Sequence, residues 1–474
     1  MKLINSISDL GKILKAKIKS VFRNKDLEAI AYKTKFIQRT TSILRPEDFL
    51  QLMTSASIEP SVVPLEGLCE KLRIFNPNAD IRAQSLMERI NREEASDFLE
   101  IILKKSLSEA FQIITEKVPA NLLESFNNIY LEDATEIELN EALCEHFKGP
   151  GGTASKSMVK INFIYEIHRR AIQDIKISDR RTPDQEMAKR VVDIIKKDDL
   201  IIRDLGYFCT EAVKTILQSQ AYFLSRLPAS VCVYLRKEDK NPIDLSKHFN
   251  TYFVQDSVID LQVYITTAKI PVRLVAYRVP EGVAAMRRKT ANRNAQKRGR
   301  NMTEASRNRL DFSLFITNVS NMIWKPEIVG TIYTIRWQIE LIFKEWKSSL
   351  NIHYIKGTNE NRVKCLLYGK LITIVIINMI FSVLDWYSET VLRLQISLHK
   401  LINWLLRDSR LAQIMIKGLS DAQIDLLCKE IWRGNRGCLL KQERKRKTTL
   451  GHIQAETPYW ELYQKVENEE FNAC

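Results

Sequence analysis

Residues 328–350 constrain the fold most, because apolar and polar side chains recur in this stretch at helical spacing. At about 100° per residue, its isoleucines and large aromatic residues fall on one broad face, which predicts a helix buried along one side. The apolar residues are Ile332, Ile335, Ile339, Ile342, Phe343 and Trp346. The polar residues, within an arc of about 60° on the same wheel, are Tyr333, Arg336, Glu340 and Lys347. Such a stripe is ordinarily a solvated face with i,i+4 ion pairs, and the alternative is one edge of a cleft.

The balance of charge predicts a polyanionic partner. The 474 residues include 72 Lys plus Arg against 57 Asp plus Glu, a formal net charge of +15 at pH 7, and the sequence pI is near 9.3. Nucleic acid is the leading candidate, and an acidic membrane surface is the alternative. A chain of this length admits a sizeable core and about two to four domains.

Cysteine and histidine usage argues against a zinc site and against a disulfide framework. The eight cysteines contain no Cys-x-x-Cys pair and the six histidines are scattered, as suits a protein of the reducing cytoplasm. The N-terminus has no long apolar block, so no signal peptide is predicted. The most apolar run, residues 371–384, contains Asn378 and is too short to span a bilayer. We therefore expect a buried core helix and no membrane partner.

Residues 1–120 are predicted to form a helical N-terminal domain. Apolar residues recur at helical spacing over 6–21, and another helix is expected from Pro46. Over 65–91, two short helices flank a turn rich in Asn, Pro and Asp, and the second helix carries Arg82 and Arg89. This arrangement is typical of a helix-turn-helix reader of DNA, but it also occurs in helical bundles. DNA contact by these two arginines is therefore one of two open interpretations.

From Asn128 onward the apolar period becomes that of strands. A strand over 129–131 leads to Asp133, and a short apolar strand over 200–203 ends at Asp204. The other expected elements are a half-exposed strand at 157–167, a strand at 171–178, a helix from 182 or 183 to 197, a helix at 211–219 and a strand at 221–227. This pattern predicts an α/β layered domain with carboxylates at strand ends.

Asp133, Asp204 and Glu340 are hypothesised to bind divalent metal ions. Hydrolysis or transfer at a phosphodiester needs an activated nucleophile and a stabilised leaving oxygen, and two cations about 4 Å apart provide both. Magnesium prefers hard oxygen ligands and retains water, so a few carboxylates suffice. Taken singly, an aspartate at a strand end is also typical of an exposed turn.

Three blocks of residues together resemble the insertion-sequence-4 family of DDE transposases. The blocks are Asp133-Ala134-Thr135, Asp204-x-Gly206-Tyr207, and the set Tyr333, Arg336, Glu340 and Lys347. The last block, within RWQIELIFKEWKSSL, is the most specific, and the resemblance extends over most of the chain. The family more often has Gly or Ser where Ala134 stands, and the residue here is still small.

The resemblance implies an α/β fold with an RNase H-like mixed-sheet core. In that core, Asp133, Asp204 and Glu340 are the catalytic residues and the ligands of two Mg²⁺ ions, with Mn²⁺ as a substitute. The expected reaction is hydrolytic nicking at a transposon end, a hairpin intermediate, and joining of the 3′-hydroxyl to target DNA. Relatives act as homodimers in synaptic complexes. We therefore expect a dimer that acts on DNA in the bacterial cytoplasm, at the nucleoid.

The resemblance also implies phosphate-binding roles. Tyr333, Arg336 and Lys347 are expected to hold the phosphates of the cleaved end, and charge suits the two cations for this role. Some relatives stack a flipped base on tryptophan. For Trp324 and Trp337 we predict core packing instead.

The long gap between Asp204 and Glu340 predicts an insertion at 229–322. Alternating runs such as DLQVYIT and VRLVAYRV indicate that the insertion is mostly β. It also contains a basic segment whose cations include Arg287, Arg288, Lys289, Arg293, Lys297, Arg298 and Arg300. A mobile solvated loop is one interpretation of this segment, and tracking of phosphates along the transposon end is the other.

Five regions are expected along the chain. They are a helical DNA-end-binding domain at 1–120, the first part of the catalytic core at 121–228, the β-rich insertion with its basic loop at 229–322, the final part of the core at 323–385, and a helical C-terminal region at 386–474. In the last region we expect helices at 391–407 and 411–432 and a basic tail at 441–447.

Two other functions stay open. One is a metal-dependent nuclease that cuts DNA without joining it, which needs the same three acids. The other is a catalytically inactive, transposase-derived DNA-binding regulator. The presence of all three acids, with the Tyr, Arg, Glu and Lys at their expected spacing, favours an active transposase.

Overall fold

The computed structural model describes residues 7–39, 41–59, 61, 63–114, 122–151, 155–252, 258–297, 299–392, 394–407, 411, 439–440 and 449–462. The chain forms two compact units, each assembled from separate stretches. Unit 1 comprises Met1–Lys117, Ala134–Thr182 and Glu340–Glu443, and unit 2 comprises Val118–Asp133, Pro183–Ile339 and Arg444–Cys474. The described strands follow the hydrogen-bonded order β3-β2-β1-β4-β5-β9-β8-β7-β6. The predicted mixture of helices and a mixed sheet is confirmed.

The N-terminal part of unit 1 is helical, as predicted. Its helices are α1 (Ile7–Val21), α2 (Asn24–Lys33), α3 (Pro46–Ser57), α4 (Leu65–Phe75), α5 (Ala83–Ile90) and α6 (Glu93–Phe111). Pro46 occupies the first turn of α3, where a missing N–H costs nothing. The rings of Phe36, Phe49 and Phe98 pack together with centroids 4.7 to 6.3 Å apart. The pair α4 and α5 corresponds to the two short helices expected over 65–91.

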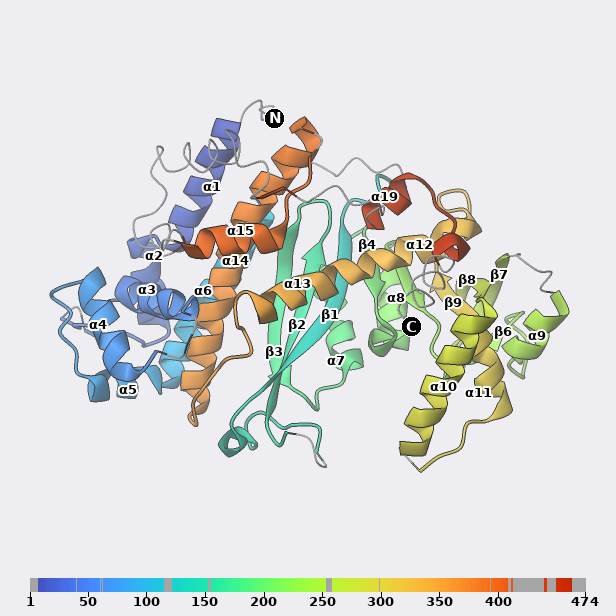
Figure 1. Ribbon diagram of the computed structural model, residues 1–474, viewed down its shortest axis with the longest axis horizontal. Coiled ribbons are helices and arrows are strands. Elements are labelled where there is room, and N and C mark those ends of the chain that lie inside the picture. The colour runs from blue at the N-terminus through green and yellow to red at the C-terminus, as the bar shows by residue number, and fades with distance from the viewer. Residues whose placement is uncertain are drawn as a thin grey trace. The chain divides into compact units, whose positions relative to one another are not determined.

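The long helix α14 (Glu360–Leu392) runs through the core of unit 1 (Figure 1). It packs against α6, α3 and α1. Gly369 permits the close approach to α3, because a Cβ there would lie 2.7 Å from the carbonyl oxygen of Met53. By length and composition α14 is apolar enough to cross a membrane, but 78% of its most apolar window is buried inside the protein. The prediction of a buried core helix at 371–384 is therefore confirmed, within a longer helix.

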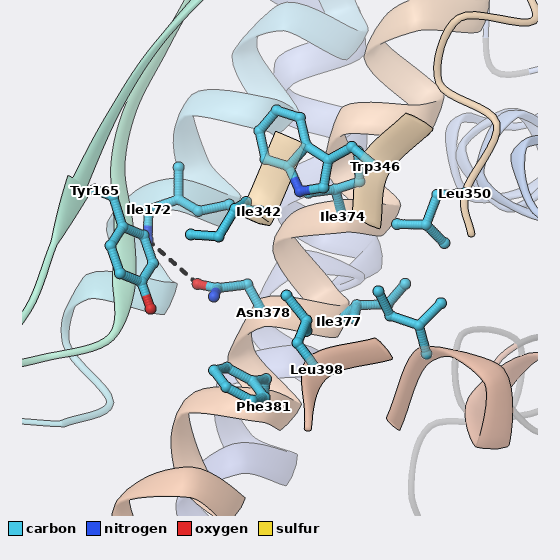
Figure 2. Close-up of a pocket in the computed structure, with 11 residues that line it drawn as sticks. Tyr165, Ile172, Ile342, Trp346, Leu350, Ile374, Ile377, Asn378, Phe381 and Leu398 are labelled. Atoms are coloured by element: carbon cyan, nitrogen blue, oxygen red, sulfur yellow. Dashed lines mark hydrogen bonds between the residues drawn. The ribbon is translucent and has the colours of Figure 1, made fainter. Parts of the chain in front are cut away.

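A small apolar cavity of about 30 Å³ lies where α14 meets α13 (Trp337–Ser348) and α15 (Leu398–Leu406). Figure 2 shows Trp346 and Leu350 facing Ile374 and Ile377 across it. Asn378 is a buried polar residue that lines this cavity. Its Oδ1 accepts from the backbone N–H of Ile172 at 3.2 Å, and its Nδ2 donates to the carbonyl of Arg170 at 3.1 Å. The amide therefore satisfies backbone groups at the start of β3.

Strands β2 (Met158–Glu166) and β3 (Ala171–Asp179) pair antiparallel in unit 1. Both were predicted, but the expectation that the first would be half-exposed is wrong, because β2 is buried from Val159 to Glu166. Polar side chains of this buried strand form hydrogen bonds with neighbouring groups. Lys160 donates to the carbonyl of Thr182 at 2.7 Å, and Asn162 donates to Ser178 Oγ at 3.0 Å. Alternation of polar side chains therefore does not indicate exposure here.

Unit 2 contains the parallel part of the sheet. The start of β1 (Ile129–Glu138) pairs with β4 (Leu200–Arg203), and β4 pairs with β5 (Tyr222–Arg226). Helix α8 (Thr210–Gln218) lies between β4 and β5 in the chain, as predicted. The helix expected up to residue 197 is shorter, because α7 (Asp184–Ala188) continues only as a 3-10 turn at Lys189–Asp193.

The strands predicted for the insertion are confirmed, and they extend the sheet of unit 2 (Figure 1). They are β6 (Val233–Tyr234), β7 (Val258–Ile265), β8 (Ile270–Arg278) and β9 (Phe312–Thr317). β9 pairs antiparallel with both β5 and β8. Helix α9 (Leu245–Tyr252) lies between β6 and β7 in the chain.

The basic segment is helical, so the expectation of a loop is wrong. It forms α10 (Glu281–Lys297), followed by α11 (Glu304–Asn308). The N-terminal part of this segment is anchored by a cluster of buried residues, Val279, Val283 and Ala284. No glycine or proline interrupts residues 283–297, and alanine, arginine, lysine and glutamine favour a helix. The run of positive charge suggested a loop, but the helix propensity of the residues decides the local structure.

Little of the C-terminal region is described. α14 extends to Leu392, and α15 begins at Leu398, so the helix expected at 391–407 is divided. The helix expected at 411–432, apart from Leu411, and the basic tail at 441–447 lie outside the described residues. Helix α19 (Thr449–Gln454) belongs to unit 2. The cysteines that the structure describes are free thiols, consistent with the absence of a predicted disulfide framework.

Candidate active site

Two neighbouring parallel strands carry the two aspartates. The pairing of β1 with β4 ends at Glu132 opposite Arg203. Asp133 is the next residue of β1, and Asp204 directly follows β4 at the start of a 3-10 turn, Leu205–Tyr207. The strands that were predicted to deliver these acids therefore lie side by side in unit 2 (Figure 1). Asp133 lies within its strand, rather than at the end where we expected it.

Arg336 contacts both aspartates, and Tyr333 contacts Asp204. Arg336 Nη1 donates to Asp133 Oδ2 at 2.9 Å, and Arg336 Nε lies 3.9 Å from Asp204 Oδ1. The Tyr333 hydroxyl donates to Asp204 Oδ1 at 3.4 Å. The side chain of Arg336 is 11% exposed, whereas those of Asp133 and Asp204 are 21% and 45% exposed. A largely buried cation therefore bridges two carboxylates that solvent can reach.

The polar stripe at 328–350 is not carried by one uniform helix. α12 (Val329–Tyr333) passes into a 3-10 turn at Thr334–Arg336, and α13 then begins at Trp337. Thr334 Oγ1 donates to the carbonyl of Thr331 at 2.6 Å, a bond that competes with regular helical pairing. The predicted apolar face is still confirmed, because Ile332, Ile335 and Ile339 are fully buried.

Aromatic residues far away in sequence hold α12 in place. A Cβ on Gly330 would lie only 2.3 Å from the ring of Tyr459, so glycine allows this ring to pack on the helix. The Gly330 N–H donates to the Tyr277 hydroxyl at 3.0 Å. The ring of Phe315 lies 5.1 Å from that of Tyr333 and 5.3 Å from that of Tyr459. No motif in the sequence indicated that Tyr277 and Tyr459 support the site.

Burial and charge keep Tyr333 protonated. Burial, followed by the negative charge of Asp204, raises the pKa of Tyr333 to about 12. The phenol therefore donates to Asp204 throughout the neutral pH range. The guanidinium of Arg226 lies over the Tyr333 ring, 5.6 Å from its centroid.

The donor set fits a hard divalent cation. Asp133 and Asp204 offer carboxylate oxygens, and the guanidinium of Arg336 already occupies a cation position between them. Magnesium is commonly bound through one or two carboxylates, with waters or substrate phosphates completing its shell. Among the described residues, no group of three or more His, Cys, Asp or Glu side chains is close enough to form a complete protein site. Of the three expected metal ligands, the structure therefore brings Asp133 and Asp204 together.

Glu340 and Lys347 lie on α13. Glu340 is exposed and follows Arg336 by four residues, and it is the first residue of unit 1. Lys347 is half-buried in the last turn of α13. Their roles as third metal ligand and as phosphate ligand stay predictions.

The two tryptophans differ. Trp324 is fully buried and its Nε1 donates to the carbonyl of Leu122 at 2.9 Å, so the prediction of core packing is confirmed. For Trp337 the same prediction is wrong, because this side chain is 57% exposed. It begins α13 next to Arg336, on the face opposite to buried Ile339 and Ile335.

The predicted DNA-binding arginines of the N-terminal helices lie in different surroundings. Arg82 is exposed, immediately before α5. Arg89 is half-buried, its Nη2 donates to Ser42 Oγ at 2.8 Å, and its guanidinium lies 5.4 Å from the centroid of Phe36. Burial lowers the pKa of Arg89. Arg89 therefore contributes to packing between helices, and its predicted contact with DNA is untested.

The basic residues of α10 form two groups. Arg287 donates to the Phe312 carbonyl at 3.4 Å and to Ser313 Oγ at 3.2 Å, and Arg288 contacts Glu281 and Asp311. These two arginines therefore attach the N-terminal half of α10 to neighbouring residues. The exposed group is Lys289, Arg293, Lys297 and, after the helix, Arg300. Arg298 lies outside the described residues.

The fold and this site define a class of α/β protein in which a mixed sheet presents paired carboxylates for a cation. Residues 124–376, more than half of the chain, match the family model described as the transposase DDE domain. The chain belongs to this family. DDE transposase domains generally use divalent metal ions, and transposases bind DNA.

Relatives with curated names are transposases of bacterial insertion sequences. The chain is 27% identical over 374 residues to the transposase for insertion sequence element IS231B of Bacillus thuringiensis subsp. berliner, covering 74% of this chain and 76% of that one. It is 28% identical over 384 residues to the transposase for insertion sequence element IS1151 of Clostridium perfringens, covering 77% and 80%. Among solved structures, a piggyBac transposase synaptic complex with hairpin DNA matches 89% of this chain and 85% of that one, with 9% identity and a TM-score of 0.45.

Proposed function

We propose that this protein is a DNA transposase that binds the ends of an insertion sequence, cleaves them by metal-dependent hydrolysis and joins the freed 3′-hydroxyls to target DNA. The observation that carries the proposal is the convergence of Asp133 and Asp204 on one cation, the guanidinium of Arg336. Membership of the DDE transposase family supports the same conclusion. We assign β1 to β5 to an RNase H-like core.

Asp133, Asp204 and Glu340 are the proposed ligands of two Mg²⁺ ions, for which Mn²⁺ can substitute. When bound, such cations activate the attacking oxygen and stabilise the leaving oxygen of a phosphodiester. Asp133 and Asp204 are suited to this role because both are accessible to solvent and lie within reach of one cation. We include Glu340 as a metal ligand because it lies about one helical turn after Arg336 in the chain.

Tyr333, Arg336 and Lys347 are proposed to bind the phosphates of the cleaved end. The planar Arg336 guanidinium, with its five N–H donors, suits bidentate phosphate binding, and it lies beside both aspartates. Exposed Trp337 provides an aromatic face beside Arg336 for an unpaired base, which supports a hairpin route of strand cleavage.

The exposed cations of α10 are proposed to follow the DNA backbone. Lys289, Arg293 and Lys297 recur every four residues and so share one face of the helix. Such contacts position DNA without reading its sequence. Arg82, before α5, is proposed to contact the element's ends. We further propose that the protein acts as a homodimer on end and target DNA, at the nucleoid in the bacterial cytoplasm.

A cleavage and joining assay tests the function. Purified full-length protein is mixed with labelled end DNA, supercoiled target plasmid and Mg²⁺. We expect nicked, hairpin and joined products from the wild type, and none from Asp133→Asn, Asp204→Asn or Glu340→Gln. Glu186→Gln, at an exposed position on α7, is the control and should react like the wild type.

Each alternative function gives a different result in this assay. Cutting without joined products would identify a nuclease, and binding without any cutting would identify a regulator. Products that persist in Glu340→Gln, together with loss in both aspartate variants, would remove Glu340 from the site and leave the aspartates in it.

A further inference from the structure

A buried ion pair lies immediately before the two aspartates in the chain. Glu132 and Arg203 are partners in the register of β1 and β4, and Arg203 Nε lies 2.6 Å from Glu132 Oε2. The two side chains are only 3% and 6% exposed. Asp133 follows Glu132 and Asp204 follows Arg203. The last paired positions of the two strands therefore carry opposite charges, and the next positions carry the acids of the candidate active site.

Glu132 and Arg203 point to the face of the sheet opposite to Asp133. Successive side chains of a strand point to opposite faces, so Glu132 and Arg203 share one face while Asp133 projects from the other. The register of β1 with β4 ends at Glu132 and Arg203. The separation of the Asp133 and Asp204 carboxylates therefore depends on how firmly this last pair joins the two strands.

Contacts on the buried face also fix the chain around Asp204. Arg203 Nη2 donates to the carbonyl of Ala188 at 3.0 Å, which attaches β4 to the end of α7. Tyr207, three residues after Asp204, is buried, and its pKa is raised first by burial and then by the charge of Glu132. Gly206 packs on Asp184, because a Cβ there would lie 2.8 Å from Asp184 Oδ2. These contacts attach the chain on both sides of Asp204 to its surroundings.

We propose that Glu132 and Arg203 are positioning residues, which set the spacing of the Asp133 and Asp204 carboxylates and thereby their joint affinity for a divalent cation. The inference rests on the proposed function, since it concerns the same two aspartates. Removal of one partner leaves a buried charge unpaired, and the strands relax or admit water to relieve it. Either change alters the separation of the adjacent aspartates.

The competing explanation is that the pair only stabilises the fold. Arg273 and Asp260 provide a matched control in unit 2, because Arg273 Nε lies 2.8 Å from Asp260 Oδ1 and the arginine side chain is 2% exposed. This pair joins β7 to β8 and carries no acid of the candidate site. Arg273→Met should therefore lower stability without changing affinity for metal.

The test is calorimetric titration of Mn²⁺ into the full-length protein without DNA, accompanied by thermal unfolding of each variant. Asp133→Asn establishes how much of the binding belongs to the aspartates. We expect Glu132→Gln and Arg203→Met to weaken Mn²⁺ binding by about tenfold or more, the range found for residues that orient metal ligands. Arg203→Lys keeps the positive charge, so it should lose less affinity than Arg203→Met, and thermal unfolding shows whether it is folded.

The outcomes separate the inference from the function. Mn²⁺ affinity at the wild-type level in folded Glu132→Gln and Arg203→Lys, with loss in Asp133→Asn, would overturn the positioning role and keep the metal site. An equal loss of affinity in Arg273→Met would also overturn it, because general destabilisation would then explain the effect. Binding that is unchanged in Asp133→Asn would contradict the proposed function itself.

Discussion

Arg336 is the residue on which the charge balance of the site depends. Its guanidinium contacts Asp133 at 2.9 Å and lies 3.9 Å from Asp204 while remaining largely buried. The two acids would otherwise repel each other at the edge of the sheet, and a buried cation relieves this repulsion. A divalent cation bound by the two aspartates would therefore compete with Arg336 for the same carboxylate oxygens.

Replacement of Arg336 by alanine should strengthen the binding of metal but slow the cleavage of DNA. We expect Mn²⁺ to bind about tenfold more tightly, because removal of one charge-assisted hydrogen bond removes the competitor. Cleavage of end DNA should fall by about a hundredfold, since the phosphate loses its cationic donor. Titration calorimetry and single-turnover cleavage measure the two effects. Weaker Mn²⁺ binding in Arg336→Ala would show that Arg336 supports the metal site instead of competing with it.

Lys370 makes stability depend on pH. Burial lowers the pKa of Lys370 to about 8, and its Nζ donates to the backbone carbonyls of Asn351 at 3.1 Å and Ser57 at 3.4 Å. The unfolded chain, with an ordinary lysine pKa of 10.5, binds the proton more tightly. Stability should therefore rise as pH increases from about 8 to about 10.5 and be lowest below that window.

Lys370→Met tests this dependence. The variant should raise the unfolding temperature at pH 7, by a free energy on the order of 1 to 3 kcal/mol, and flatten the rise between pH 8 and 10.5. Thermal unfolding at several pH values measures both, with exposed Lys237→Met as the control. A wild-type stability that falls across this window would contradict the assignment.

The sequence motifs predicted which residues would meet in a site, but not the contacts that bring them together. The motif spacing singled out Asp133, Asp204, Tyr333 and Arg336, and these four converge in unit 2. Their convergence depends on β1 pairing with β4, which involves strands separated by a hairpin and a helix. Tyr459 and Gly330 were missed, because a ring packed on a glycine leaves no periodic pattern in the sequence.

At the scale of elements, continuous apolar runs were predicted well and charged runs were not. The strand at 200–203 has the bounds expected from its apolar residues. In β2, the alternation of polar and apolar side chains indicated a half-exposed strand. The strand is buried, and its Lys160 and Asn162 form hydrogen bonds with neighbouring groups. In α10 the positive charge suggested a loop, but the segment is a helix. Near its N-terminus, Arg287 forms a hydrogen bond with Ser313, and Arg288 forms ion pairs with Glu281 and Asp311.

The helical form of α10 makes its proposed DNA contact measurable. Replacement of both Lys289 and Arg293 by alanine should weaken binding to end and random DNA equally and lower the slope of log K against log salt by about 2. Fluorescence anisotropy at several salt concentrations measures this slope. The matched control neutralises exposed Lys237 and Lys240, which changes net charge equally in the same unit. An equal loss of slope in the control would assign the effect to net charge instead of α10.

At the scale of the whole molecule, the chain returns twice to each of its two compact units. Asp133 ends one segment of unit 2, and Ile339 ends the next, directly before Glu340. Asp133, Asp204, Tyr333 and Arg336 all belong to unit 2. A net charge of +15 and membership of the DDE transposase family fit a protein whose partner is DNA.

A crystal structure of the full-length protein grown with Mn²⁺, with the ion located by anomalous scattering, tests most directly whether Asp133 and Asp204 share a divalent cation. We predict an anomalous peak within about 2.5 Å of carboxylate oxygens from both aspartates, and its loss in Asp133→Asn. A peak bound elsewhere, with the Arg336 contacts to both aspartates intact, would contradict the account.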